Sequence, residues 1–493
     1  MNDANAYNLV DEPWIPVLMQ DGSSRRVSLG AIFSDASGDI ADLALTPYER
    51  VAVFRLLLCI AQAALGPDRL ADESAWRAAQ SAVGPAASAY LAKWHDRFFL
   101  YGPHAFLQPD DVAPAASDAL TPCDKLAFRL ASGNNSTLFD HGAGADNLRL
   151  TDADLALGFL VYQNFSAGGL SGMCRWSGKV TEKHIKGAPC REQSMLFSIL
   201  MGNNLLATIW LNLLTMKMVK NGLSAEWGTP AWELAELSRA ETSDLSHTFL
   251  GHLAPLSRAV KLSPSTPNCI LGEGVIYPQL PEWREPMATV KPTRDENPSY
   301  VAANPARMPW RDLSSILAIR QNSNRKSALA LRHLESLPEE AVFSMWTGGL
   351  CAKQAKEIDT VEWKARLSVL VLEESRMQKY ENAIAYSETQ CKQMISAAIS
   401  YAEALKMSKV KKDGHDIFST CVVAERIYWD ILAQPENQML VQDVGSDTYL
   451  GDWKKASRKA AEEAYRRACP AMTARQMEAY AQGYSKLTVR EED

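Results

Sequence analysis

The sequence predicts an α+β protein with a large mixed N-terminal domain over residues 1–361 and a C-terminal four-helix bundle over residues 362–493. Two observations lead to this prediction. The N-terminal part alternates strand-like stretches with helical periods and loops, whereas the remainder is amphipathic at helical spacing almost throughout. In addition, a chain of 493 residues exceeds what one hydrophobic core usually supports, so more than one domain is expected.

The first predicted elements are two strands and a long apolar helix. Residues 14–19 and 26–29 flank the turn Gly22-Ser23-Ser24, a pattern typical of a β-hairpin. Thr46-Pro47-Tyr48-Glu49 then offers an N-cap, a proline at the first position and an acidic first turn, so a helix is expected to begin there and run to Gly66. Because Arg55 interrupts its apolar run and a membrane span needs about 20 apolar residues, we expect a buried core helix and no membrane association.

The middle of the chain mixes helices with irregular backbone. Residues 72–83 and 86–99 keep helical spacing, and a further helix is expected over about 152–164. Residues 132–144 form a long polar loop, and such loops inside a domain are usually functional or disordered. The apolar stretch 190–217 fits a strand or a buried helix equally well.

The C-terminal part contains four amphipathic segments with short connections. This pattern predicts an antiparallel bundle. The segments are residues 364–408, 417–433, 443–469 and 473–484.

Composition restricts the class of protein only partly. The formal net charge of -7 argues against a nucleic-acid binder when taken alone, because phosphate contacts need Lys and Arg. A local basic track can nevertheless coexist with an acidic exterior. The nine cysteines are scattered, without a CxxC pair or zinc spacing, and the N-terminus lacks a signal-peptide pattern. We therefore expect reduced thiols in a cytoplasmic protein and no metal.

The common catalytic motifs are absent from the sequence. It contains no phosphate-binding GxxxxGK[ST] loop, no GxSxG elbow, no HExxH and no EF-hand pattern. The cluster Gly168-Gly169-Leu170-Ser171-Gly172 follows a helical pattern and lacks the GxGxxG order of a dinucleotide loop. His247 and His252 are expected to be structural, since clustered metal ligands are missing. No catalytic residue and no cofactor are predicted.

Several segments resemble one protein family in collinear order. The chain opens with Asn-Leu-Val-Asp-Glu-Pro-Trp-Ile-Pro-Val at residues 8–17. Similar segments follow at residues 56–62, 98–100, 106–108, 132–144, 168–172 and 346–350. In this order they resemble the CasA family, the large subunit of the type I-E CRISPR surveillance complex Cascade.

The resemblance implies a non-catalytic DNA-recognition subunit. Such a subunit recognises the protospacer-adjacent motif (PAM) in double-stranded DNA, initiates unwinding and R-loop formation with the guide RNA, helps hold the displaced non-target strand and recruits the Cas helicase-nuclease. Its partners are the other Cascade subunits and the 5′ handle of the guide RNA. Two alternatives remain open from the residues alone: a free-standing α-rich metabolic enzyme with an unrecognised site, and a purely structural scaffold.

The resemblance also assigns a wedge and a motif-reading loop. The pattern Gly-Gly-x-x-x-x-Gln at residues 348–354 places the family's glutamine wedge at Gln354, in a turn that starts at the glycines. Lys353 and Ala355 flank the wedge, and Lys353 stands where the family has Asn. The glycine cluster resembles the loop that approaches the motif with its main chain, since a missing Cβ admits nucleic acid. We expect Gly168, Gly169 and Gly172 to act there, although a flexible turn fits these glycines equally well.

The loop 132–144 resembles the family's loop that docks on the guide-RNA 5′ handle, with Asn134, Asn135 and the aromatic anchor Phe139. A core position for Phe139 is the alternative. The family's lysine finger should fall at residues 269–274, which contain no lysine, and neither Lys261 nor Lys291 aligns convincingly in its place. Candidate phosphate contacts, which fit a solvated helix face equally well, are Lys291, Lys406, Lys409, Lys454, Lys455 and Arg458.

Overall fold

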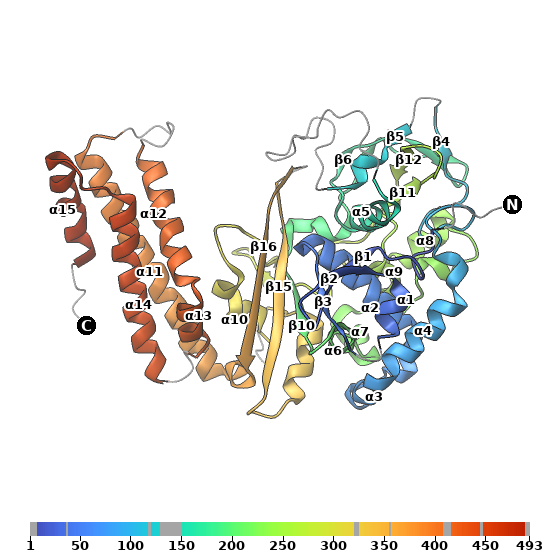
Figure 1. Cartoon of the computed structure of the whole chain (residues 1–493), viewed down its shortest axis with the longest axis horizontal. Helices are drawn as coiled ribbons and strands as arrows, with labels where there is room; N and C mark the ends of the chain where they lie inside the picture. The colour runs from blue at the N-terminus through green and yellow to red at the C-terminus, as the bar shows by residue number, and fades with distance from the viewer. Residues whose placement is uncertain are drawn as a thin grey trace. The chain divides into compact units, whose positions relative to one another are not determined.

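The computed structural model describes residues 7–35, 38–116, 120–128, 150–319, 325–353, 356–407, 416–443 and 447–488. It contains two compact units (Figure 1). Unit 1 comprises Met1–Leu337 and Phe343–Arg366, and unit 2 comprises Pro338–Val342 and Leu367–Asp493. The expected boundary after residue 361 falls inside strand β16 (Lys356–Ser368), which ends just beyond the division between the units.

Unit 1 is built around the long helix α2 (Pro47–Arg69), as the sequence predicts. The Glu49 carboxylate accepts the Thr46 N–H at 3.1 Å, which caps the helix start. By length and composition α2 is the one described helix that could cross a membrane, but 72% of its most apolar window is buried within the protein. Helices α4 (Val83–Lys93), α5 (Asp152–Phe165) and α9 (Phe249–Leu253) pack against it.

The described residues include four three-stranded sheets. The predicted N-terminal hairpin is present as β1 (Ile15–Met19) and β2 (Ser24–Val27), with β3 (Ile40–Leu43) on the other side of β1. A second sheet has the order β10 (Phe197–Met201), β15 (Val342–Lys353) and β16. The third has the order β11 (Arg258–Lys261), β12 (Asn268–Glu273) and β5 (Leu120–Pro122). The fourth has the order β4 (Ala113–Pro114), β7 (Cys174–Trp176) and β8 (Lys179–Val180).

Short elements complete unit 1. The ambiguous stretch 190–217 contains both predicted alternatives, β10 followed by helix α6 (Leu205–Leu211) and the start of α7 (Met216–Leu223). The remaining strands are β6 (Gly169–Leu170), β9 (His184–Ile185), β13 (Val290–Pro292) and β14 (Pro298–Tyr300). The remaining α-helices are α1 (Leu29–Phe33), α3 (Glu73–Ala78), α8 (Arg239–Leu245) and α10 (Leu313–Ile316).

Unit 2 is the predicted helical bundle. Its long helices are α11 (Glu374–Ala404), α12 (Ile417–Leu432), α14 (Asp447–Ala468) and α15 (Ala474–Thr488), and the short α13 (Pro435–Gln442) follows α12. Helix α11 packs against α12, α14 and α15. The buried Trp453 side chain donates to the Ala383 carbonyl at 3.0 Å, which fixes α14 on α11.

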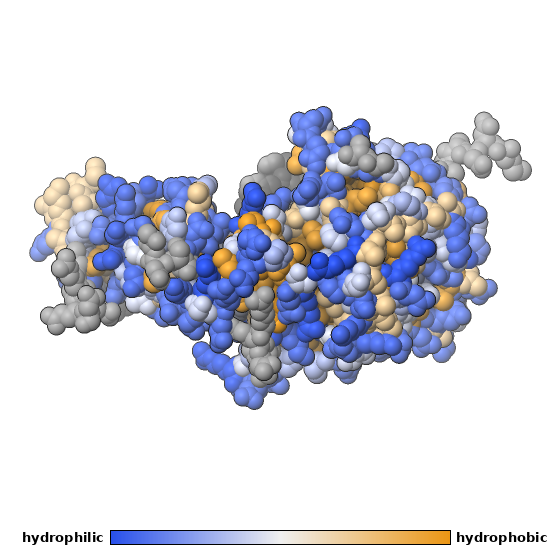
Figure 2. Space-filling model, turned by 90° about the horizontal axis from the view of Figure 1, so that it is seen from below, coloured by the Kyte–Doolittle hydropathy of each residue, from blue (hydrophilic) through white to orange (hydrophobic). Residues whose placement is uncertain are grey.

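The expected helix start at residue 364 is wrong. Residues 361–368 alternate between buried and exposed positions, as a strand requires, and helix α11 begins only at Glu374. The mixed N-terminal part and the helical C-terminal part together confirm the predicted α+β fold class. On the face drawn in Figure 2, hydrophilic residues predominate, with apolar residues between them.

Candidate nucleic-acid interface

The glycine cluster lies where the chain leaves the C-terminal end of α5. Strand β6 pairs antiparallel with β9, and the Ser171 N–H donates to the Lys183 carbonyl at 2.9 Å. We call residues 168–185, which include the β7–β8 hairpin, the glycine segment. The two ends of this segment lie side by side, because β6 near its start pairs with β9 at its end.

Glycine is required at the three predicted positions for different structural reasons. A Cβ on Gly168 would lie 2.9 Å from the Gly187 nitrogen, and one on Gly172 would lie 2.7 Å from the Leu271 oxygen, so close backbone packing excludes a side chain at both positions. Gly169 instead has a φ of +121°, which favours glycine, and no described atom within 4 Å of its Cβ position. Gly169 is therefore the glycine that leaves open space where a side chain would lie.

Strands β15 and β16, which are neighbours in one sheet, flank the predicted wedge position in the sequence. Strand β15 ends at Lys353 and β16 begins at Lys356, so Gln354 and Ala355 lie between the strands and outside the described residues, as does the Lys353 side chain. The expectation that the glycines start a turn is wrong. Gly348 and Gly349 lie within β15, where a Cβ on Gly349 would be 2.7 Å from the Met195 oxygen.

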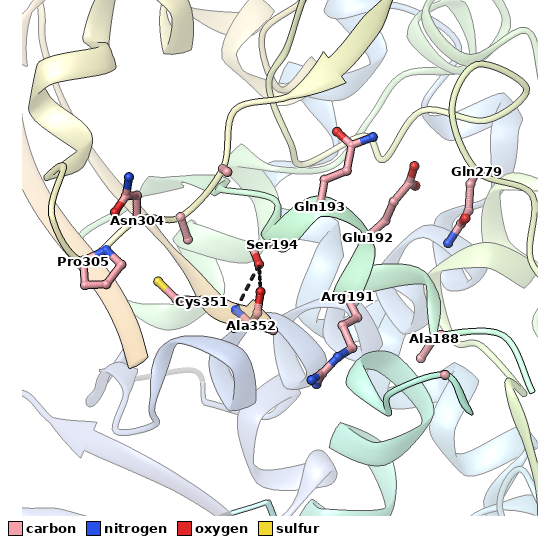
Figure 3. Close-up of a pocket in the computed structure, with 14 residues that line it drawn as sticks. Ala188, Arg191, Glu192, Gln193, Ser194, Gln279, Asn304, Pro305, Cys351 and Ala352 are labelled. Carbon is pink, nitrogen blue, oxygen red and sulfur yellow. Dashed lines mark hydrogen bonds between the residues drawn. The ribbon is translucent and has the colours of Figure 1, made fainter. Parts of the chain in front are cut away.

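A hollow of about 620 Å³ joins the glycine segment to the hairpin of β15 and β16 (Figure 3). Gly168 lines it from one side, and Cys351 and Ala352 at the end of β15 line it from another. Ser194 fixes this part of the hairpin, because its Oγ accepts the Ala352 N–H at 3.0 Å and donates to the Ala352 carbonyl at 3.1 Å. The structure thus brings Gly168 close to the end of β15, which precedes the predicted wedge position in the sequence.

Polar side chains that the sequence reading did not assign to the site also line the hollow. Arg191 donates to the Phe165 carbonyl at the C-terminal end of α5, at 3.1 Å. Burial raises the pKa of Glu192 to about 7, so its charge varies near neutral pH. Gln279 and Asn304 provide amide groups on other loops (Figure 3). These residues share no sequence motif, so only the fold reveals their proximity.

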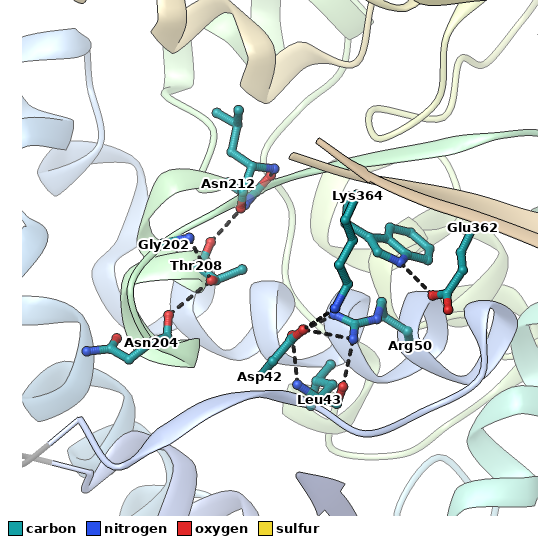
Figure 4. Close-up of polar contacts among 11 residues, drawn as sticks. Asp42, Leu43, Arg50, Gly202, Asn204, Thr208, Asn212, Glu362 and Lys364 are labelled. Atoms are coloured by element: carbon teal, nitrogen blue, oxygen red, sulfur yellow. Dashed lines mark hydrogen bonds and ion pairs between the residues drawn. The ribbon is translucent and has the colours of Figure 1, made fainter. Parts of the chain in front are cut away.

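Within unit 1, a partly buried charge cluster connects the hairpin to β3 and α2 (Figure 4). The Asp42 carboxylate accepts from Arg50 at 2.6 and 3.0 Å and from Lys364 of β16 at 3.0 Å. Arg50 also lies over the Trp346 ring of β15, 5.3 Å from its centre, and the Trp346 indole donates to Glu362 at 3.1 Å. Burial alone would raise the pKa of Asp42, but the two cations hold it below its usual value.

An exposed basic strip follows the glycine cluster. Among the described residues, no ion-pair partner is seen for Arg175, Lys179, Lys183 or Lys186, and all four are exposed. The four residues lie within a short stretch of the sequence but share no motif. These residues make this part of the chain locally basic although the net charge of the whole chain is negative.

The other predicted residues are distributed over both units. In unit 1, Lys291 is half-buried on β13, and Lys261 is 3.1 Å from Asp110. The stretch 269–274, where the lysine finger was sought, largely coincides with strand β12. Asn134, Asn135, Phe139 and Lys409 lie outside the described residues.

In unit 2, the predicted phosphate contacts differ in their surroundings. Lys406 is exposed just after α11, and Arg458 is exposed on α14. The Lys454 ammonium lies 5.4 Å from the centre of the Tyr386 ring, and Lys455 pairs with Asp452 at 3.1 Å. Exposed pairs of this kind are weak, so Lys455 can still exchange its partner for a phosphate.

The described part of the chain offers no metal site. No group of three His, Cys, Asp or Glu side chains in it is arranged to hold an ion. His252 is fully buried and stacks on Trp283 with ring centres 4.2 Å apart, and burial holds its pKa well below the usual value. It is a neutral core residue.

Known proteins match this chain over nearly its whole length. Residues 8–470 match the family model of CRISPR-associated protein Cse1. The CRISPR-associated protein CasA/Cse1 of Thermus thermophilus is 30% identical, with 98% of this chain and 97% of that protein covered.

Solved structures share the fold. A crystal structure of Thermus thermophilus CasA has a TM-score of 0.77 at 24% identity, with 98% of each chain covered. A chain of a CRISPR RNA-guided surveillance complex has a TM-score of 0.73 at 17% identity, with 98% of this chain and 99% of that chain covered. These matches confirm the resemblance seen in the sequence: the chain belongs to the CRISPR-associated protein Cse1 family, also called CasA.

Proposed function

We propose that this chain is the large, non-catalytic subunit of a type I-E CRISPR Cascade surveillance complex and acts in the cytoplasm. Family membership supports the assignment, as does the shared fold with a chain of an RNA-guided surveillance complex. Its partners in this proposal are the other Cascade subunits, the guide RNA, double-stranded target DNA, the displaced strand and the Cas helicase-nuclease.

The subunit recognises the PAM with the main chain around Gly169 and opens the duplex with Gln354. The observation that carries this proposal is the hollow shared by Gly168 and the end of β15, because a reader and a wedge must act on neighbouring base pairs. Unstacking one base step costs about a few kcal/mol. Pairing of the opened strand with the guide RNA and new backbone contacts offset this cost.

Phosphate contacts orient the duplex and hold the displaced strand. The basic strip of the glycine segment lies beside Gly169 in sequence and in strand pairing, so it suits the phosphates next to the motif. In unit 2, Arg458 and its neighbour Lys459 are exposed on α14 and suit the phosphates of a single strand. The loop with Asn134, Asn135 and Phe139 docks on the guide-RNA handle in this proposal.

Duplex opening by the reconstituted complex tests the proposal. A fluorescent base analogue at the first guide-matched pair of a linear, motif-bearing duplex reports the opening rate. We expect Gln354→Ala to slow opening by about tenfold or more, equivalent to ~1.4 kcal/mol. The matched control is Gln378→Ala, because Gln378 is exposed on α11 and bonds only locally to Asn382.

A second DNA substrate distinguishes a defect in duplex opening from a defect in assembly or binding. On a duplex whose first pairs are mismatched, both variants should equal the unsubstituted complex, since no wedge is needed. Unchanged opening of the matched duplex by Gln354→Ala would remove the wedge assignment. Equal opening by a complex that lacks the subunit would favour the scaffold alternative.

A further inference from the structure

A buried arginine joins the two ends of the glycine segment. Arg258 is the first residue of β11 and is 2% exposed. Its Nη2 donates to the Ala167 carbonyl at 3.0 Å and to the Lys186 carbonyl at 2.8 Å. Ala167 precedes the segment and Lys186 follows it, so one guanidinium binds both ends.

Arg258 is itself held in one position. Its backbone N–H donates to Gln163 Oε1 at 2.8 Å, and the Gln163 amide donates to the Arg258 carbonyl at 2.9 Å. Gln163 lies in the last turn of α5, where unpaired carbonyls carry partial negative charge and favour a cation. Burial lowers the pKa of Arg258 to about 10. This value is still well above neutral pH, so the guanidinium remains charged.

The two ends of the segment have little room to move. The Ala188 N–H donates to the Ser166 carbonyl at 2.9 Å, and the backbone at Gly168 approaches Gly187 so closely that a Cβ would not fit. Without Arg258 the partly buried carbonyls of Ala167 and Lys186 would lose the charged donor that they share, and hydrogen bonds to charged groups contribute more than neutral ones. The segment would then settle in a different position or become looser.

We propose that Arg258 is a positioning residue for motif recognition, which fixes the main chain of Gly169 at the duplex although Arg258 itself lies in the core. This inference rests on the proposed function of the glycine segment. Recognition groups must be held within about 0.5 Å of their productive geometry. We therefore expect Arg258→Met to reduce the preference for a motif-bearing over a motif-free duplex by about tenfold, equivalent to ~1.4 kcal/mol.

The test compares binding of three DNAs by reconstituted complexes that contain the full chain. The DNAs are a guide-matched duplex with the motif, the same duplex without it, and the single target strand, which needs no motif. The matched control is Arg284→Met, because Arg284 is a half-buried arginine of the same unit and its described hydrogen bond is to the Ser327 carbonyl at 3.0 Å. Arg258→Met should lower the motif preference and keep single-strand binding, whereas Arg284→Met should keep both.

Arg258→Lys keeps the charge on a shorter side chain, whose ammonium contacts the Ala167 and Lys186 carbonyls less closely, so it provides a milder variant if Arg258→Met does not assemble. It should lower the motif preference by a smaller factor and speed hydrogen exchange at the Ser171 and Ala188 amides. Faster exchange with an unchanged preference would overturn the positioning role, as would an unchanged preference in Arg258→Met. If the unsubstituted complex shows no motif preference, the proposed function itself fails, which distinguishes the two failures.

Discussion

Replacing Asp42 with Asn tests the charge cluster against which the hairpin of β15 and β16 packs. Asp42 accepts two hydrogen bonds from Arg50 and one from Lys364. The side chains of Asp42 and Arg50 are only 11% and 5% exposed, whereas that of Lys364 is 56% exposed. Asparagine keeps the shape of the side chain but removes the charge that both cations require.

The magnitude follows from these exposures. Removing one partner of a buried ion pair typically costs about 3–5 kcal/mol, because the other charge is left buried. An exposed pair contributes at most about 1 kcal/mol. We therefore expect Asp42→Asn to lower the free energy of unfolding by about 3 kcal/mol and Lys364→Gln to lower it by less than about 1 kcal/mol.

The pH dependence has a defined sign. The pKa of Asp42 is lowered in the folded protein, so its stabilisation is present above the unfolded pKa of about 4 and is lost as the pH falls through the folded value. The difference in unfolding free energy between the unsubstituted chain and Asp42→Asn should shrink below about pH 4.

Denaturant unfolding of the full chain, followed by tryptophan fluorescence, measures these quantities. The set comprises Asp42→Asn, Arg50→Met, their double variant and Lys364→Gln as the exposed control. The double variant should lose clearly less than the sum of the two single losses, because each single change strands the other partner. A loss below about 1 kcal/mol in Asp42→Asn, or one equal to that of Lys364→Gln, would refute the stabilising role of the buried Asp42–Arg50 pair.

Three further predictions concern other groups. Because the pKa of Glu192 is raised to about 7 in the folded protein, the chain should become less stable as the pH rises from about 5 to 7. Glu192→Gln should remove about 1 kcal/mol of that loss, after allowance for the partial exposure of the side chain. Melting temperatures of both proteins at pH 5 and 8 measure this difference. Phe139→Ala should weaken retention of the subunit in the complex, and normal co-purification would count against the anchor role. Replacing Arg458 and Lys459 with Gln should reduce the slope of log K against log salt concentration for displaced-strand binding by about 0.7 per lost contact. Arg466→Gln should change this slope less, because Arg466 pairs with Glu463.

Much of the fold follows from local sequence signals. The Thr46 to Glu49 start signal and the apolar run after it predict α2, and the amphipathic spacing of the C-terminal part predicts the bundle. Residues 361–368 were misassigned, although Val361, Trp363, Ala365 and Leu367 alternate with polar residues and so carry a strand signal. The nearby helical period obscured that short alternation.

The site was predictable only in pieces. The glycine cluster and Gln354 can be found by resemblance, but nothing in the sequence indicates that Gly168 and Ala352 line one hollow. Arg258 has no motif at all, because its role depends on carbonyls at Ala167 and Lys186 that the fold brings together. Contacts to backbone atoms leave no residue-type signature at the accepting positions.

Photo-crosslinking tests most directly whether the glycine segment and the hairpin turn meet the same short stretch of duplex. A photoreactive phenylalanine analogue can replace Leu170, which is 68% exposed beside Gly169, or Gln354, with exposed Lys217 of α7 as the control position. We predict crosslinks from position 170 to the motif, crosslinks from position 354 to the first guide-matched pair, and only background from position 217. Crosslinks from positions 170 and 354 to distant parts of the DNA, or at the level of position 217, would contradict the central claim.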